Sequence, residues 1–177
     1  MRVISGTARG RKLETLEGEA TRPTTDRVKE AIISAVQFDI ENSVVLDLFA
    51  GSGQLGIECL SRGAKRCVFV DNNRACQEII KRNLQATGLF KQSKVVCMQA
   101  EDFVKTSSEK FDIVFLDPPY KSGLISEVSD MLISKMNDNG VIVCETSSSE
   151  QMPEKMGDFI TKKPHKFGNI VFWVYRK

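Results

Sequence analysis

From Val44 onward the chain alternates short apolar runs with longer amphipathic segments, and this alternation most narrows the folds open to it. Short apolar runs bounded by turn residues predict buried strands, whereas apolar residues three or four positions apart predict helices. Strands alternating with helices form a parallel sheet with helices on both faces. Strands are expected at 44–48, 67–70, 94–98, 111–116 and 141–144, and helices at about 54–62, 73–87, 100–105 and 124–135.

The C-terminal part departs from this alternation. Residues 159–163 and 169–176 are predicted to form an antiparallel hairpin through the connection 164–168, since 170–174 is apolar on both faces, as in a covered strand. We therefore predict a doubly wound α/β fold whose mostly parallel, seven-stranded sheet is closed by this hairpin. One domain should span 1–177, with a Rossmann-like core at 41–177 and an N-terminal extension at 1–40.

The N-terminal extension is predicted to hold a short hairpin and a helix. Residues 2–16 mix apolar residues with glycines around a basic turn at 8–11. A helix should open near Asp26, which suits the positive end of a helix, with a threonine before it as the cap. Propensity does not explain the arginines Arg22 and Arg27 on either side of this start. The apolar face of the helix is predicted to contain Val28, Ala31, Ile32, Ala35 and Val36.

The distribution of charge is more informative than the net charge of +2. Residues 1–12 and 158–177 are both strongly basic, so the residues between them carry a net negative charge. Either basic end alone is typical of ordinary solvated surface, but together they fit a polyanion held at two edges of the protein.

Cysteine usage and hydropathy point to an intracellular protein. The five cysteines are scattered singly, as expected of reduced thiols in the cytoplasm, and no metal site is predicted. No apolar stretch is long enough to cross a membrane, and the first residues do not form a signal peptide.

A glycine-rich pattern, G-x-G-x-x-G, occupies residues 51–56 between a predicted strand and a predicted helix, and Asp71 ends the next strand. Glycines let a ligand approach the backbone, and a carboxylate on the second strand can accept both hydroxyls of a ribose. The pattern therefore predicts a nucleoside-bearing cofactor. Glycines that only turn the strand into the helix are the less favoured interpretation, since Asp47 and Asp71 flank them.

The acids around this loop favour S-adenosylmethionine (SAM) over NAD. A dinucleotide needs a helix N-terminus directed at its pyrophosphate, whereas the ammonium of SAM needs a carboxylate, which Asp47 supplies. Asp47 could instead cap the loop. Further along, Gln99 could contact the adenine because an amide both donates and accepts. Glu101 and Asp102 could equally mark only a helix start.

The segment Asp117-Pro118-Pro119-Tyr120 follows a predicted buried strand. Two prolines make a stiff turn, and their missing N–H groups leave carbonyls that can accept hydrogen bonds from a substrate amine. The first and fourth strands should lie side by side, so this turn would share a crevice with the glycine loop. Asp117 and the Pro118 carbonyl could then hold an exocyclic base amine toward the methyl group of SAM, with Tyr120 stacked on the flipped base. A rigid turn with a packing tyrosine is the alternative.

These motifs together resemble a known family. Asp117 to Tyr120 is similar to the signature of SAM-dependent amino-group methyltransferases, and residues 6–13 and 22–30 resemble the RsmD family of bacterial 16S ribosomal RNA guanine-N2 methyltransferases. The four-residue signature is also typical of adenine-N6, cytosine-N4 and protein-glutamine enzymes, so the N-terminal stretch carries the acceptor specificity. Gln99 departs from the Asp or Asn that related enzymes often have.

The resemblance implies an enzyme with a SAM-dependent methyltransferase fold that forms S-adenosylhomocysteine (SAH) and modifies 16S rRNA in the 30S subunit or an assembly intermediate. A single domain with one crevice is compatible with a monomer, which we expect in the cytoplasm. The resemblance implies that Asp117, Pro118, Pro119 and Tyr120 are catalytic. It implies a cofactor site of Asp47, Phe49, Gly51, Gly53, Asp71, Asn72, Gln99, Ala100 and Asp117, and RNA contacts by Arg9, Arg11, Lys12, Arg22, Arg27 and Lys166.

Several alternatives stay open. Arg22 and Arg27 could contact RNA phosphate or the cofactor carboxylate, or could pin the helix to the sheet. His165 is expected to be exposed surface, with an RNA contact as the second interpretation. For the whole protein, the alternatives are an NAD-dependent oxidoreductase, which Asp47 disfavours, and a non-enzymatic RNA-binding protein with basic ends.

Overall fold

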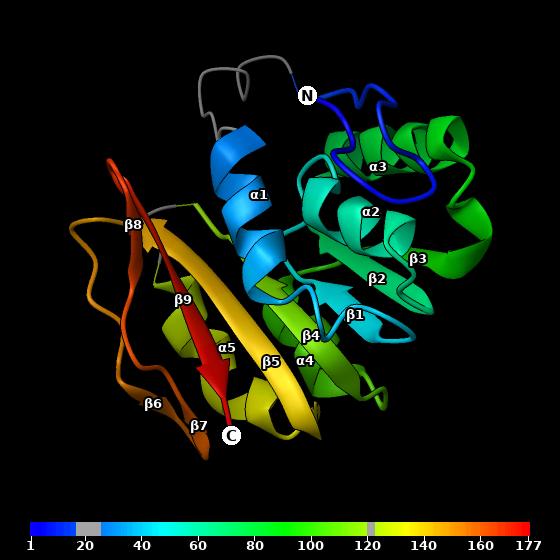
Figure 1. Ribbon diagram of the computed structural model, residues 1–177. Coiled ribbons are helices and arrows are strands. Elements are labelled where there is room, and N and C mark those ends of the chain that lie inside the picture. Colours follow the sequence, from blue (N-terminus) through cyan, green and yellow to red (C-terminus); the bar gives the residue numbers. More distant parts are fainter. Residues whose placement is uncertain (17–25, 120–122) are drawn as a thin grey trace.

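The computed structural model describes residues 1–16, 26–119 and 123–177. One sheet runs through the middle of the molecule, with strand order β3-β2-β1-β4-β5-β9-β7-β6 and β8 paired to β9 (Figure 1). Strands β1 to β5 are parallel, and β9 is antiparallel to β5. The strands are β1 (Val44–Asp47), β2 (Arg66–Asp71), β3 (Ser93–Cys97), β4 (Phe111–Leu116), β5 (Met136–Ser147), β6 (Lys155–Met156), β7 (Phe159–Ile160), β8 (His165–Phe167) and β9 (Ile170–Arg176).

Helices cover both faces of the sheet, as predicted (Figure 1). Helices α1, α2 and α3 pack with one apolar cluster, and α4 and α5 pack with the other. Within the described ranges no helix is both long and apolar enough to cross a bilayer. The helices are α1 (Asp26–Ala35), α2 (Gln54–Ser61), α3 (Arg74–Thr87), α4 (Ala100–Thr106) and α5 (Leu124–Ile133), with a 3₁₀ turn at Phe90–Gln92.

The central strands explain why both faces are apolar. Successive side chains of a strand point to opposite faces, so in β4 Ile113 and Phe115 join the α1–α3 side while Val114 and Leu116 join the other. Strand β1 pairs in parallel with β4, with Asp47 opposite Phe115. The predicted adjacency of the first and fourth strands is therefore confirmed, and the segments that follow them leave the sheet at the same edge.

The C-terminal region is more divided than the predicted single hairpin. Strand β7 meets β9 at one pair, Ile160 and Arg176, and the expected connection 164–168 itself contains β8. The chain reverses instead at Gly168, whose φ of 59° lies in the left-handed region that glycine adopts without a steric cost. Because the return to β9 is broken into these short strands, the sheet has nine strands among the described residues, where seven were predicted.

The N-terminal segment (residues 1–16) is a closed loop with less strand than the predicted hairpin. Its bridge joins Arg2 and Lys12, and the N–H of Val3 donates to the Arg11 carbonyl at 2.9 Å. The predicted apolar face of α1 is buried at Val28, Ile32 and Val36, while Ala31 and Ala35 are half-buried. The threonine expected to cap α1 lies outside the described residues. Sequence analysis missed that Lys29 and Ile33 are also buried.

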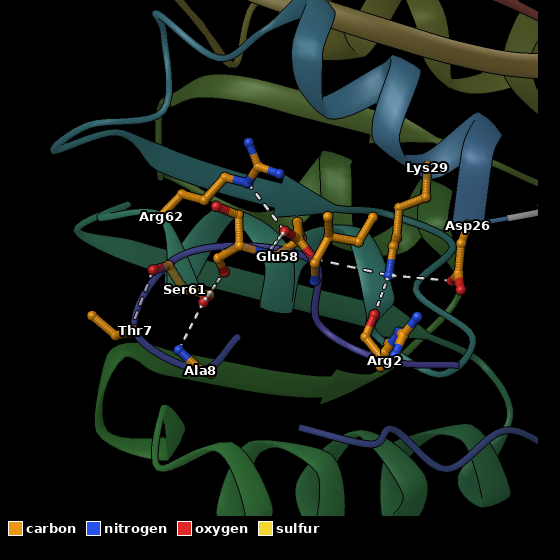
Figure 2. A network of polar contacts seen from close by, with 10 residues as sticks. Arg2, Thr7, Ala8, Asp26, Lys29, Glu58, Ser61 and Arg62 are labelled. Atoms are coloured by element: carbon orange, nitrogen blue, oxygen red, sulfur yellow. Dashed lines mark hydrogen bonds and ion pairs between the residues drawn. The ribbon is translucent and has the colours of Figure 1, made fainter. Parts of the chain in front are cut away.

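A buried polar network fixes the N-terminal segment to α1 and α2 (Figure 2). Glu58, which is 1% exposed, accepts hydrogen bonds from the N–H groups of Ile4 and Ser5, both at 2.9 Å. The Lys29 Nζ lies 3.8 Å from Glu58 and donates to the Arg2 carbonyl at 2.6 Å. Burial lowers the pKa of Lys29, and the negative charge of Glu58 opposes that shift.

Ser61, at the end of α2, completes the same attachment. Its hydroxyl donates to the Ser5 carbonyl at 2.6 Å and accepts from the Ala8 N–H at 3.0 Å. A Cβ on Gly6 would lie 1.8 Å from the Ser61 carbonyl oxygen, so this close approach requires glycine. The basic turn is thus held by hydrogen bonds with defined partners.

We predict that Glu58→Gln lowers the free energy of unfolding by about 3 kcal/mol, because it removes the buried counter-charge of the Lys29 ammonium and leaves only the exposed Asp26, 4.0 Å away. Chemical denaturation followed by circular dichroism measures the change. The control is Glu78→Gln, which breaks an exposed pair with Lys81 (3.0 Å) and should cost less than about 1 kcal/mol. Equal effects of the two substitutions would contradict the role given to the buried pair.

Candidate active site

A cavity of about 600 Å³ lies at the carboxyl ends of strands β1 to β4. Its walls come from the loop after β1, from the ends of β2 and β3, from the segment after β4 and from the N-terminal segment. Doubly wound sheets bind ligands at this edge, where the strand order reverses. The predicted site residues that line the cavity are Asp47, Phe49, Gly51, Asp71, Asn72, Gln99, Ala100, Asp117 and Pro119.

The three glycines of the loop serve different purposes. Gly51 lines the cavity, whereas Gly53 is not among the lining residues that the structure describes. Gly53 has a φ of 77°, and a Cβ there would meet Ile80 at 3.2 Å and Phe69 at 3.3 Å. A Cβ on Gly56 would lie 2.3 Å from Phe69. Gly53 and Gly56 therefore let α2 start sharply and pack closely on β2, as in dinucleotide-binding loops.

Two carboxylates from neighbouring strands shape the loop. Asp71 accepts hydrogen bonds from the N–H groups of Gly51 (2.9 Å) and Asn73 (2.8 Å). Asp47 accepts from the N–H of Gly56 at 3.1 Å. Asp47 thus caps the loop, which was the alternative interpretation, and its side chain also lines the cavity. Asp71 uses two of its oxygen lone pairs for backbone donors and Asp47 uses one, so both carboxylates keep further acceptor capacity.

Burial raises the pKa of Asp47 from 3.8 to about 7. The nearby charge of Asp71 raises this pKa further, while the hydrogen bond from Gly56 lowers it. A carboxylate that is 3% exposed is poorly solvated, so its ionised form gains from any cation that enters the cavity. The site therefore has an electrostatic preference for a positively charged group beside Asp47.

A pair of amides forms another side of the cavity. The side-chain N–H of Asn72 donates to the Gln99 carbonyl oxygen at 2.9 Å. Gln99 is the N-cap residue of α4 but makes no capping bond with its side chain. Glu101 and Asp102 lie in the first turn of α4, as the alternative interpretation expected, and also line the cavity. Amide donors and acceptors thus line the cavity just beyond the ends of β2 and β3.

The predicted catalytic turn follows the buried end of β4. Asp117 is half-buried and lines the cavity, as does the exposed Pro119. Pro118 is buried, and the part of the cavity wall that the structure describes does not include it. Tyr120 lies outside the described residues. The structure therefore brings the Asp117 side chain into the same cavity as Asp47 and Asp71.

The predicted RNA-binding residues that the structure describes are exposed, and the cavity lining includes none of them. His165, interpreted as surface, is exposed and stacks on Phe172 with ring centroids 4.5 Å apart. Arg22 is outside the described residues. The exposed residues are Arg9, Arg11 and Lys12 in the N-terminal segment, Arg27 in α1 and Lys166 in β8.

Sequence analysis missed several parts of the cavity wall, among them Met1, Thr15 and Gln54. Met1 and Thr15 come from the N-terminal segment, which pairs with residues far along the chain, so no local pattern marks them. Gln54 follows the second glycine, and its buried side-chain oxygen makes no hydrogen bond in the described part of the chain. Over the same ranges, no cluster of His, Cys, Asp and Glu could hold a metal ion.

Comparison with known proteins gives matches over nearly the whole chain. A family model described as "Conserved hypothetical protein 95" matches residues 1–176. A provisionally named rRNA methyltransferase of Bacillus subtilis is 37% identical over 182 residues, covering 100% of this chain and 99% of the relative. Ribosomal RNA small subunit methyltransferase D of Haemophilus influenzae is 38% identical over 157 residues, covering 86% and 81%.

Solved structures give the same result. A structure from Escherichia coli, described as a provisionally assigned methyltransferase, is 32% identical and has a TM-score of 0.89, covering 100% of this chain and 97% of that one. The predicted methyltransferase fold is thereby confirmed. Because the family model and these relatives span almost all of its residues, the chain belongs to the Conserved hypothetical protein 95 family, which is the RsmD family.

Proposed function

We propose that this protein transfers a methyl group from SAM to the exocyclic N2 amine of a guanine in 16S rRNA of the small ribosomal subunit. The observation that carries the proposal is the shared cavity, which joins the glycine loop, Asp47 and Asp71 to Asp117 at the neighbouring strand end. Family membership and relatives named as small-subunit rRNA methyltransferases support the choice of substrate.

The polar groups of the cavity fit SAM. The buried carboxylate of Asp47 would hold the ammonium group, and Asp71 would accept hydrogen bonds from the ribose hydroxyls. Asn72 and Gln99 would contact the adenine with their amides. When bound, SAM supplies a methyl group already activated as a sulfonium. The main tasks of the protein are therefore orientation of the acceptor and exclusion of water.

Asp117 is proposed to act on the acceptor. The amine of guanine is a weak nucleophile because its lone pair is conjugated with the ring. Hydrogen bonds from this amine to the Asp117 carboxylate and the Pro118 carbonyl would turn the lone pair toward the methyl group and stabilise positive charge on the nitrogen. Pro119 would stiffen this turn, and Tyr120 would stack on the base, with a contribution of about 1–3 kcal/mol.

The RNA is proposed to bind across the exposed basic residues of the N-terminal segment, α1 and β8. Arg9, Arg11, Lys12, Arg27 and Lys166 are exposed and could contact phosphates. Arg22 completes the proposed set. The substrate would be the 30S subunit or an assembly intermediate. The protein would act in the cytoplasm as a monomer with a single domain, and it would need neither a metal ion nor attachment to a membrane.

We predict that the protein methylates small-subunit particles that lack the modification, and that nucleoside digestion yields N2-methylguanosine. Asp117→Ala should keep its affinity for SAH but lose about 10²- to 10³-fold in turnover, because it removes an acceptor aligned with the reacting amine. Asp130→Ala, an exposed acid of α5, is the control and should retain full activity.

Two results would count against this function. Labelled N6-methyladenosine or methylated glutamine would move the enzyme to another acceptor class. Full turnover by Asp117→Ala would remove this residue from the proposed mechanism.

We predict that the affinity for SAH rises with pH until Asp47 is ionised. Since its folded pKa is about 7, the dissociation constant should fall about tenfold per pH unit below about pH 7 and then level off. Asp47→Asn should bind more weakly and show a flat profile. Isothermal titration calorimetry of both proteins measures this, and parallel profiles would show that another group controls the pH dependence.

In the ligand-free protein, the contribution of Asp47 to the unfolding free energy should fall as pH rises, whereas the affinity for SAH rises. A raised carboxyl pKa contributes stability that is fully present below the unfolded value of 3.8 and is lost as pH rises toward about 7. The asparagine of Asp47→Asn does not titrate. Between pH 3.8 and about 7, the unfolding free energy of this variant should therefore rise relative to that of the wild type. Denaturation series at each pH provide the check.

A further inference from the structure

Asn83, in the middle of α3, is a buried side chain with three hydrogen bonds to backbone groups. Its oxygen accepts from the N–H of Glu14 at 2.8 Å, and its nitrogen donates to the Glu14 carbonyl at 3.0 Å. The same nitrogen donates to the carbonyl of Ser52 at 2.9 Å. With 1% exposure, the amide is shielded from water, so these bonds have no solvent competitor.

The two segments joined by Asn83 belong to different parts of the site. Ser52 lies inside the glycine loop and lines the cavity. Glu14 precedes Thr15, which lines the cavity from the N-terminal segment together with Met1. The N–H of Leu13 donates to the Met1 carbonyl at 3.0 Å, so both ends of the N-terminal segment are tied to this point.

Only a side-chain amide satisfies this position. It must supply one acceptor and two donors from one short side chain, and Asn does this at the observed distances. An aspartate would keep the acceptor for the Glu14 N–H but would present oxygen lone pairs to two carbonyls. Apolar packing alone would not require this residue type, because the neighbouring Ile79, Ile80 and Leu84 already fill the buried face of α3.

The N-terminal segment also carries the basic residues proposed to bind RNA. Arg11 and Lys12 stand three and two positions before Glu14, respectively, and are exposed. At the other end of the basic turn, Glu58 and Ser61 hold residues 4–8 on α2. A shift of the glycine loop is therefore passed to Glu14 through Asn83, and then along a short tethered stretch to the basic turn.

We propose that Asn83 is a positioning residue that couples occupancy of the cofactor cavity to the placement of the basic N-terminal segment. This inference rests on the proposed function, because it takes SAM or SAH to be the ligand that occupies the cavity. Coupling between binding sites is reciprocal, so RNA bound to the N-terminal segment strengthens cofactor binding by the same factor. The enzyme thereby favours RNA engagement in its cofactor-loaded form.

Hydrogen exchange measured by mass spectrometry tests the coupling without RNA. In the wild type, saturating SAH should slow exchange of residues 1–16 by about fivefold or more, the low end of typical coupling factors. In Asn83→Asp, which breaks the bonds to the carbonyls of Ser52 and Glu14, slowing should stay within the glycine loop. Equal protection of residues 1–16 in both proteins would mean direct contact of SAH with Met1 and Thr15, and would overturn the proposal, as would no protection in the wild type.

Matched variants separate coupling from general loss of structure. Arg82→Ala removes an exposed ion pair with the Glu14 side chain (2.8 Å) and should behave as the wild type. If Asn83→Asp does not fold, Glu14→Pro removes the N–H that donates to Asn83, and Glu14→Ala retains it. Protection of residues 1–16 should be reduced in the first, which keeps only the bond from Asn83 to the carbonyl of residue 14, and unchanged in the second; full protection in Glu14→Pro would overturn the proposal.

Steady-state kinetics give the second readout. Asn83→Asp should raise KM for the small-subunit particle by about fivefold or more with kcat retained, whereas a merely structural defect lowers kcat through loss of folded enzyme. An unchanged KM would overturn the coupling. SAH-dependent protection with no methyl transfer to rRNA would refute the proposed function but leave the coupling standing, and a wild type that does not bind SAH would remove both.

Discussion

Two carboxylates on adjacent strands hold the glycine loop between them, and the rest of the site depends on this arrangement. Asp71 accepts from the N–H of Gly51 and Asp47 from that of Gly56. Because both acids stand at strand ends beside the switch point of the sheet, the bonds that shape the loop also place negative charge in the cavity. Burial raises the pKa of Asp47 to about 7 because it disfavours the ionised carboxylate. A cation bound beside Asp47 would therefore stabilise this ionised form.

Buried polar contacts set the position of the N-terminal segment together with the apolar side chains of Val3, Ala8 and Leu13, which join the core. Glu58 and Ser61 hold its first half on α2, while Asn83 holds its second half against the glycine loop. Buried polar groups must be satisfied by specific partners, so they define one register for a segment with little strand structure. The surface proposed to meet RNA and the cavity proposed to hold the cofactor are therefore built on one continuous unit.

Local sequence patterns predicted the parts of the fold that local physics determines. The strand and helix alternation placed Asp117 beside the glycine loop. Because β1 and β4 are parallel neighbours, the segments that follow them both lie at the carboxyl edge of the sheet. Contacts between distant segments could not be seen in this way: Met1 lines the cavity, and Asn83 bonds to Glu14, which lies 69 positions before it in the chain. The short strands near Gly168 also escaped, since two or three residues carry no readable periodicity.

Carbon-13 NMR of labelled aspartate carboxyls tests most directly whether Asp47 holds the cationic end of the cofactor. In the ligand-free protein the Asp47 resonance should titrate with a midpoint near pH 7. With saturating SAH that midpoint should fall by about 1–3 pH units, because an opposite charge within a few ångströms favours the ionised acid. An Asp47 midpoint that SAH leaves unchanged would contradict this assignment.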